Sequence, residues 1–200
     1  MVGVRQFDED KVLDHVMEVF WRKGAGETTM ADLASATGVQ RGSLYNAYGG
    51  KELLLSKALG RYAERWRDKA AAALDDPDPQ TAMAGFLGTH MERMRDPINP
   101  PGCLVTGVCM EQSDFSTPIS AEIEAQFNAT EAALKRYFEA AQERGALPAD
   151  RDPRALARFF VATTRAMAVM HKAHRGSLEP VEDVAKVALT VLGRTADLSG

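Results

Sequence analysis

The sequence predicts an all-α protein: a three-helix head with a helix-turn-helix, then a larger helical body, about nine helices in total. Three observations support this. Apolar residues recur at helical spacing in most segments, Gly and Pro separate the segments, and no useful length of chain alternates polar with apolar residues. We place the head at residues 1–51 and the body at residues 52–200.

The first helix is predicted over residues 8–23, after an arm of residues 1–7. Acidic residues fill its first turn, where a helix dipole favours negative charge. Gly24 and Gly26 end the helix. Its apolar residues share one face and are expected to enter the core: Val12, Leu13, Val16, Val19 and Phe20.

Residues 28–51 contain two short helical patterns joined by a tight turn. Thr29 is suited to cap the first of them, and Asp32, three residues later, completes a pair like a capping box. Gly38 stands where the chain needs a residue at positive φ to leave the helix. The second helix is predicted from Gln40 to Tyr45, with polar groups near its start. We therefore predict a helix-turn-helix with a recognition helix.

The body is expected to hold six further helices, separated by an Asp/Pro linker at residues 75–80 and a Pro-rich loop at residues 96–102. The last two helices are apolar on more than one face, which predicts burial of more than one face. Two interpretations remain open, a protein core and a dimer interface. The predicted ranges are residues 52–74, 81–95, 103–113, 118–144, 153–174 and 181–192.

Composition places limits on function. The chain has 200 residues, 45% of them hydrophobic, and a formal net charge of −4. The head has six basic and seven acidic residues, a net of −1, which argues against nonspecific DNA affinity but not against specific binding. Two cysteines do not make a secreted disulfide framework, and no leader or long apolar run is apparent, so we expect a cytoplasmic protein without membrane partners.

The stretch TTMADLASATGVQRGSLYNAYGGKELL closely resembles the helix-turn-helix of TetR-type transcriptional repressors, and the resemblance covers residues 8–54. It lies in the Thr pair, Gly-Val at the turn, Gly-Ser-Leu-Tyr in the recognition helix and the Lys-Glu pair. Thr37, Gln40 and Ala47 depart from the usual residues. In the body, PPGCLVTGVCME resembles a Gly-Cys-Leu segment that opens a ligand-domain helix in one branch of the family.

The resemblance implies an all-helical homodimer that joins through its last two helices and binds double-stranded operator DNA. In the head, Arg is suited to guanine and Gln to adenine, while Gly42 permits close approach and Tyr hydroxyls and Lys51 can contact phosphates. Tyr48 as packing, Asn46 as a helix end and Arg41 as a solvated charge are the alternatives. The candidate DNA contacts are Thr28, Thr29, Gln40, Arg41, Gly42, Ser43, Tyr45, Asn46, Tyr48 and Lys51.

The body needs a site for a small apolar or reactive effector. Cys103 is expected at a helix start, where the dipole favours the thiolate; a reactive sensor and an inert buried thiol are both open. His171 and His174 can share a metal or cap a helix end. The candidate effector contacts, each of which can instead be core, are Trp66, Phe86, His90, Met94, Cys103, Met110, Phe127, Phe159, Thr163 and Met167.

We therefore predict a repressor that binds a palindromic operator as a homodimer and is released by a small-molecule or electrophile effector. No nucleophile motif or cofactor loop occurs in the sequence, so we expect no enzymatic activity, cofactor or metal. Two alternatives are a thiol enzyme that uses Cys103 with His90, and a helical ligand carrier without DNA function. The carrier leaves residues 40–51 unexplained, and salt-dependent binding to a two-fold symmetric DNA site would separate it from a repressor.

Overall fold

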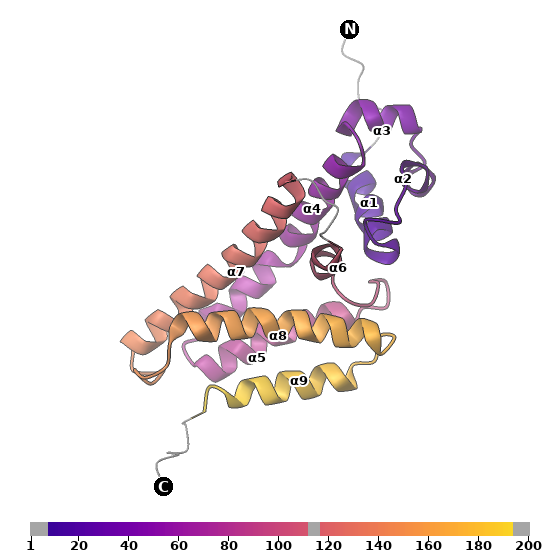
Figure 1. The fold of residues 1–200 in the computed structure, drawn as a ribbon. Helices are drawn as coiled ribbons and strands as arrows, with labels where there is room; N and C mark the ends of the chain where they lie inside the picture. The colour runs from indigo at the N-terminus through magenta and orange to yellow at the C-terminus, as the bar shows by residue number, and fades with distance from the viewer. Residues whose placement is uncertain (1–7, 112–116, 194–200) are drawn as a thin grey trace. The chain divides into compact units, whose positions relative to one another are not determined.

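The computed structural model describes residues 8–111 and 117–193 (Figure 1). These described residues form nine α-helices and no β-strand, so the all-α prediction is confirmed. The predicted arm at residues 1–7 and the last two residues of the predicted 103–113 segment lie outside them. The helices are α1 Glu9–Lys23, α2 Met30–Thr37, α3 Arg41–Tyr48, α4 Lys51–Ala72, α5 Pro79–Arg95, α6 Leu104–Met110, α7 Thr117–Glu143, α8 Pro153–Ala173 and α9 Glu179–Thr190.

Capping residues explain where the helix ends differ from the sequence prediction. Helix α5 begins two residues early because Asp78 caps it, accepting from the Thr81 N–H at 2.8 Å, and Pro79 fits the first turn. Helix α3 continues past Tyr45 to Tyr48. It ends where Gly49 adopts a φ of 80° and its N–H donates to the Tyr45 carbonyl.

The chain divides into two compact units, which we call the head unit and the body unit. The head unit combines residues 1–65 with 103–125, and the body unit combines residues 66–102 with 126–200. Helix α6 therefore belongs with α1 to α3, although it follows them by more than 50 residues. This division falls within α4, between residues 65 and 66, and the boundary proposed from the sequence, between residues 51 and 52, also falls within α4, one residue after its start.

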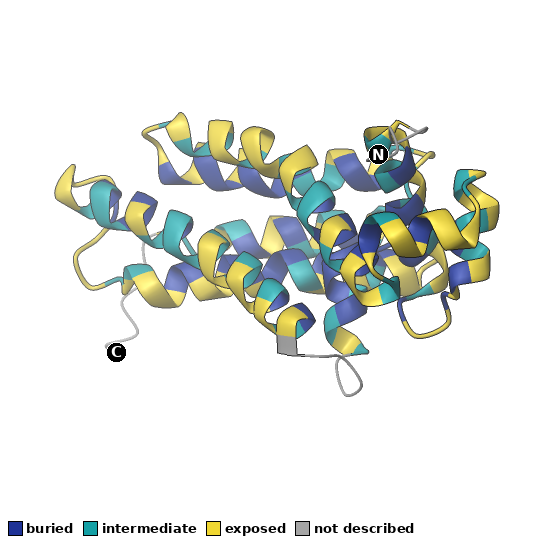
Figure 2. Ribbon diagram, turned by 90° about the horizontal axis from the view of Figure 1, so that it is seen from above, coloured by how far each residue is buried: buried dark blue, intermediate teal, exposed yellow. Residues whose placement is uncertain are grey.

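The head unit has a core of apolar side chains from α1 to α4 and α6 (Figure 2). Trp21 and Tyr62 meet edge to face with ring centroids 5.1 Å apart. Two nitrogens of Arg61 in α4 donate hydrogen bonds to the carboxylate of Asp14 in α1, at 3.1 and 3.3 Å. This bidentate contact fixes the two helices to each other. Completely buried members of this core include Val16, Leu33, Leu44, Leu54, Ala58 and Leu59.

The body unit packs α8 against α9 and α5, as Figure 1 also shows. Phe138 of α7 and Phe160 of α8 are both completely buried, with ring centroids 5.9 Å apart. Arg93 is 3% exposed within the apolar face of α5. Over the described ranges, no helix combines the length and hydropathy needed to cross a lipid bilayer.

Candidate nucleic-acid interface

The start of α2 is fixed by a complete capping box, as the sequence predicted. The Thr29 hydroxyl accepts from the Asp32 N–H at 3.2 Å, and the Asp32 carboxylate accepts from the Thr29 N–H at 2.7 Å. Lys23 at the end of α1 also donates to this carboxylate, at 2.7 Å. The Lys23 ammonium, followed by the Thr29 hydroxyl and N–H, holds the pKa of Asp32 well below its usual range.

Loss of this cap should destabilise the fold. We expect Thr29→Ala to lower the free energy of unfolding by about 1 kcal/mol, because the first turn of α2 loses a side-chain acceptor. Thermal and urea unfolding measure the change. Ser35→Ala, an exposed change in the same helix, is the control and should not destabilise the protein, since Ala is the better helix former. Equal stability of both variants would contradict this role of Thr29.

The turn of the helix-turn-helix is built by Gly38 and Thr37. Gly38 adopts the left-handed conformation, with φ 68°, as its position predicted. The Thr37 hydroxyl donates to the Leu33 carbonyl at 2.7 Å and accepts from the Val39 N–H at 3.3 Å. Thr37, which departs from the residue usual at this point, therefore provides hydrogen bonds for the turn that alanine cannot make.

Helix α3 is attached to the head by few side chains. Only Leu44, completely buried, and Tyr48, 5% exposed, belong to the core, and they are four residues apart on one stripe. The remaining surface of α3 is available to a partner. The exposed candidate residues on and next to this helix are Gln40, Arg41, Gly42, Ser43, Tyr45 and Asn46.

The N-terminal end of α3 suits a negatively charged partner. Gln40 gives it no side-chain cap, and its first turn holds Arg41 and no acidic residue. A Cβ atom added at Gly42 would meet no atom of the chain within 4 Å. The protein itself therefore has room for a side chain at position 42. A partner surface that approaches α3 closely would not leave room for one.

The curated relatives and solved structures agree with this geometry. Residues 12–58 match the family described as "Bacterial regulatory proteins, tetR family", and residues 81–187 match "Tetracyclin repressor-like, C-terminal domain". The chain belongs to the TetR family. It is thus a DNA-binding transcriptional repressor by family, and the resemblance found in the sequence is confirmed.

Three TetR-family proteins illustrate the similarity over most of the chain. The repressor ComR of Escherichia coli is 30% identical over 92% of this chain and 88% of its own length. The regulator YezE of Bacillus subtilis is 27% identical over 94% and 97%. A cysteine-substituted form of the regulator CifR, solved with 26-base-pair operator DNA, is 27% identical over 95% of this chain and 99% of its own, with a TM-score of 0.86.

Three candidate contacts of this TetR-family head do not have free side chains. Thr28 is 1% exposed and donates its hydroxyl to the Gly24 carbonyl, so it closes the α1–α2 turn. Tyr48 is core, which favours the packing alternative over a phosphate contact. Lys51 donates to the carbonyls of Ala25 and Gly26, at 3.0 and 3.3 Å. We therefore remove Thr28 and Tyr48 from the set of candidate DNA contacts. In the DNA-free protein, the Lys51 ammonium binds the backbone of the head and not a phosphate.

In the body unit, three candidate effector residues follow one stripe of α5. Phe86 and Met94 are buried, and Phe86 lies edge to face with His90 at 5.1 Å between centroids. Burial, followed by the positive charges of Arg93 and Arg165, holds the pKa of His90 well below its usual range, so this ring is neutral at neutral pH. The sequence interpretation missed Arg93, which stands seven residues after Phe86 on the same helical stripe.

The other effector candidates separate into different environments. Met167 is completely buried, Trp66 is half-buried, and the half-buried Phe127 ring has the Arg165 guanidinium 4.4 Å from its centroid. Phe159, 39% exposed, and Thr163, 6% exposed, line a groove between α8 and α9 that is open to solvent. Met110 is 79% exposed on α6, which belongs to the head unit. We remove Phe159, Thr163 and Met110 from the effector set.

The cysteines and histidines lie in specific contacts. Cys103 is 5% exposed, and its sulfur accepts from the Tyr62 hydroxyl at 3.2 Å within the head unit. His171 is 3% exposed and accepts the Gly102 N–H at its Nδ1, at 3.1 Å. Burial lowers the pKa of His171, so the predicted role as a positive helix cap is wrong for this residue. Among the residues described, no three His, Cys, Asp or Glu side chains gather to hold a metal ion.

Proposed function

We propose that this TetR-family protein binds a two-fold symmetric operator as a homodimer and places α3 of each subunit in the major groove. The observation that carries the proposal is the outer surface of α3. Apart from Tyr45, whose exposed ring carries a hydroxyl, its exposed positions hold polar or small residues, and the capping box and the Thr37 turn fix the preceding helix. The operator complex of CifR supports the same use of the head in this chain. Such a repressor acts in the cytoplasm, where bacterial DNA lies.

The exposed side chains divide by chemistry. Arg41 suits O6 and N7 of guanine, and Gln40 suits N6 and N7 of adenine. Ser43, Tyr45, Asn46 and Thr29 are short or hydroxyl-bearing groups that suit phosphate oxygens, and Gly42 lets the helix approach the bases. With a net charge of −1 in residues 1–51, one head binds weakly, and a dimer raises the effective concentration of the second head.

We expect Gly42→Ala to separate stability from DNA binding. A helical alanine should raise the free energy of unfolding by about 0.5–1 kcal/mol, while its methyl group holds α3 away from the groove and lowers operator affinity severalfold. Gly60→Ala in α4 is the matched control, because its added Cβ also meets nothing within 4 Å. Gly60→Ala should stabilise the protein and leave affinity unchanged. If both variants bind DNA as the wild type does, Gly42 does not face the groove.

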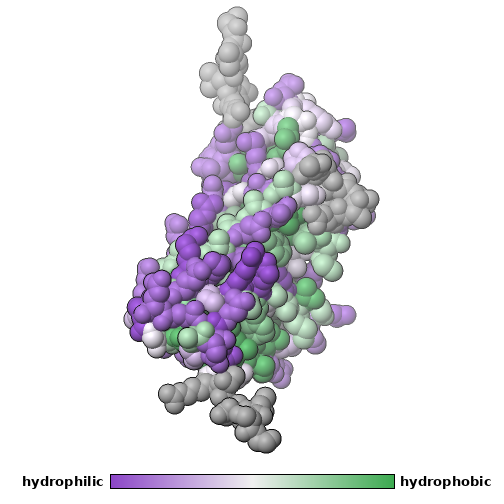
Figure 3. Space-filling model, turned by 60° about the vertical axis from the view of Figure 1, so that its left-hand side comes forward, coloured by the Kyte–Doolittle hydropathy of each residue, from purple (hydrophilic) through white to green (hydrophobic). Residues whose placement is uncertain are grey.

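The dimer interface is assigned to the outer faces of α8 and α9. Four exposed residues of α8 at intervals of three and four, Phe159, Ala162, Ala166 and Val169, form an apolar stripe. This stripe borders the groove between α8 and α9, on whose other side Val187 is 69% exposed. Figure 3 shows hydrophobic surface, in green, exposed in the lower half of the view. Small residues allow the close helix packing of a four-helix interface.

We also assign effector sensing to the body unit and to Cys103. A hydroxyl that donates to sulfur, as Tyr62 does, stabilises the thiolate that forms when a thiol loses its proton. A thiolate attacks small electrophiles. The Cys103 side chain is only 5% exposed, so its packed surroundings have no room for a bulky adduct. The adduct must therefore displace α6, which begins at the next residue.

Alkylation tests the role of Cys103. Because Cys109 is half-buried and can also react, we use the Cys109→Ser background. Iodoacetamide should then modify Cys103, as mass spectrometry detects, and release bound DNA in a fluorescence anisotropy assay. Adding Cys103→Ser should make the protein insensitive to the reagent. Normal release from this doubly substituted protein would show that the sensing group lies elsewhere.

The main experiment is selection of duplexes from a random pool by the full-length protein, followed by affinity measurements at several salt concentrations. We expect a two-fold symmetric consensus, and an affinity that falls steeply with salt because phosphate contacts release counterions. Weak binding without a symmetric consensus would contradict the proposal and support a ligand carrier without DNA function.

A further inference from the structure

Two charged side chains hold the turn between α1 and α2. The Gly26 N–H donates to Glu111 Oε2 at 2.7 Å, and Lys51 Nζ donates to the Ala25 carbonyl at 3.0 Å. The Ala25 carbonyl and the Gly26 N–H belong to one peptide group, and in a trans peptide they point in opposite directions. One carboxylate and one ammonium therefore hold the two ends of the same peptide group.

This arrangement is stronger than two separate neutral hydrogen bonds. Each bond is charge-assisted, and each polarises the peptide in the direction that strengthens the other. Gly24 leaves room for the carboxylate, because a Cβ atom built there would lie 2.7 Å from Glu111 Oε1. Lys51 makes a second bond to the Gly26 carbonyl at 3.3 Å. The turn is thus fitted to both charged groups.

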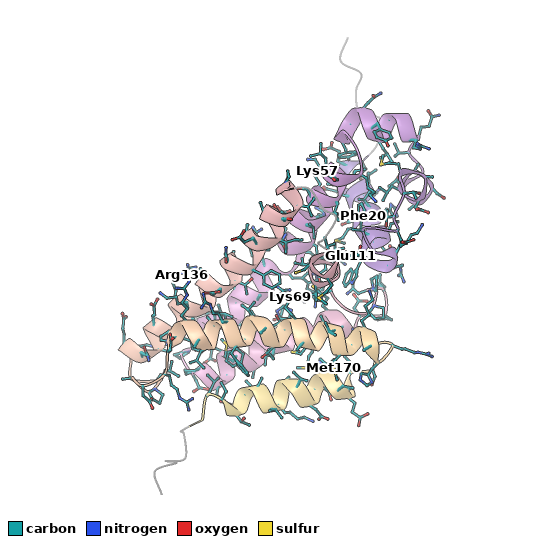
Figure 4. The ribbon with its side chains drawn as sticks, in the orientation of Figure 1. Phe20, Lys57, Lys69, Glu111, Arg136 and Met170 are labelled. Carbon is teal, nitrogen blue, oxygen red and sulfur yellow. The ribbon has the colours of Figure 1, made fainter. Side chains whose placement is uncertain are left out.

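The two charged groups come from elements with different roles. Lys51 begins α4 directly after the recognition helix, and Glu111 is the C-terminal cap of α6 (Figure 4). The turn that precedes α2 is therefore tied to the start of α4 and to the end of α6 at the same peptide group. Since Arg61 fixes α4 to Asp14 of α1, a shift of α6 is not absorbed by sliding between α1 and α4.

We propose that Glu111 is a positioning residue that makes the arrangement of α2 and α3 depend on the position of α6. While its carboxylate accepts from Gly26, the turn is held and α3 is presented for DNA binding. When α6 moves and this bond breaks, the turn loosens and operator affinity falls. The inference uses DNA binding, the proposed function, as one readout, and the order of the turn in the DNA-free protein as an independent one.

Glu111→Ala and Glu111→Gln test the proposal in the full-length dimer. For Glu111→Ala we expect faster hydrogen exchange at Gly26 and about tenfold weaker binding to the duplex selected by the wild type. Glu111→Gln keeps an oxygen that can accept from Gly26, and should restore much of both properties. The control is Glu124→Ala, which removes the same charge from an exposed site on α7 and should leave both unchanged or slightly strengthen DNA binding.

The control matters because a charge effect and a positioning effect have opposite signs. Loss of a negative charge alone favours DNA binding, whereas loss of the turn contact weakens it. Coupling is also reciprocal, so the duplex should slow hydrogen exchange in α6 of the wild type but not of Glu111→Ala. Unchanged exchange at Gly26 in Glu111→Ala overturns the inference. If the wild type binds no duplex, the proposed function fails, and exchange at Gly26 still decides whether Glu111 orders the turn.

Discussion

Replacement of Arg41 by alanine is expected to weaken operator binding at least about thirtyfold. A bidentate contact of Arg with guanine contributes about 1–3 kcal/mol, and a dimer makes the contact twice. Arg41 is exposed at the first position of α3, so its loss should leave the fold and the dimer intact. Fluorescence anisotropy with the selected duplex measures affinity, and a panel of duplexes changed at one base pair shows whether discrimination relaxes at a single position.

The matched control for Arg41 is Arg67→Ala, an exposed change of the same charge in the body unit. It should alter affinity little and should not alter discrimination between bases. A general loss of affinity in Arg41→Ala, with unchanged discrimination, would instead assign Arg41 to a phosphate. An affinity equal to that of the wild type would leave Arg41 as a solvated charge, the alternative open from the sequence.

Replacement of Val187 by glutamate is expected to dissociate the dimer and abolish operator binding. Val187 is 69% exposed, so the change costs a folded subunit little. In the proposed interface each subunit would bury a carboxylate without a partner, which should weaken dimerisation at least about a hundredfold. Sedimentation velocity measures the dimer, and unfolding experiments establish that the subunit stays folded.

The control for the dimer variant is Lys186→Glu, which introduces the same residue one position earlier. Lys186 is exposed and does not line the groove between α8 and α9. This variant should therefore remain dimeric, although its change in charge is larger. A dimeric Val187→Glu protein that still binds its operator would place the interface on another surface.

Much of the head could be predicted because the signals are local. Thr29 with Asp32 and Gly38 with its positive φ each depend on residues within a few positions, and the structure places both as predicted. Tyr48 was partly predictable, since it stands four residues after the buried Leu44 and so shares its stripe. The burial of Thr28 could not be predicted, because a threonine next to a helix cap can either lie on the surface or donate its hydroxyl to a carbonyl within the turn.

Contacts between distant residues could not be predicted from spacing. Glu111 and Gly26 are 85 residues apart, and no periodicity links them. Lys51 was assigned to phosphates because it begins a helix, yet its ammonium lies on carbonyls 25 and 26 residues earlier in the chain. We therefore expect Lys51→Ala to weaken operator binding and also to speed hydrogen exchange in the turn, which the loss of a phosphate contact alone would not cause.

The shallow attachment of α3 has a consequence for how such a protein changes over time. Only Leu44 and Tyr48 of its eight residues belong to the core. Most of its exposed positions can vary with little effect on folding, because surface substitutions usually change stability by less than about 0.5 kcal/mol. In the proposed operator complex, descendants of this gene can therefore acquire new target sequences through substitutions at these exposed positions, without compensating changes elsewhere in the chain.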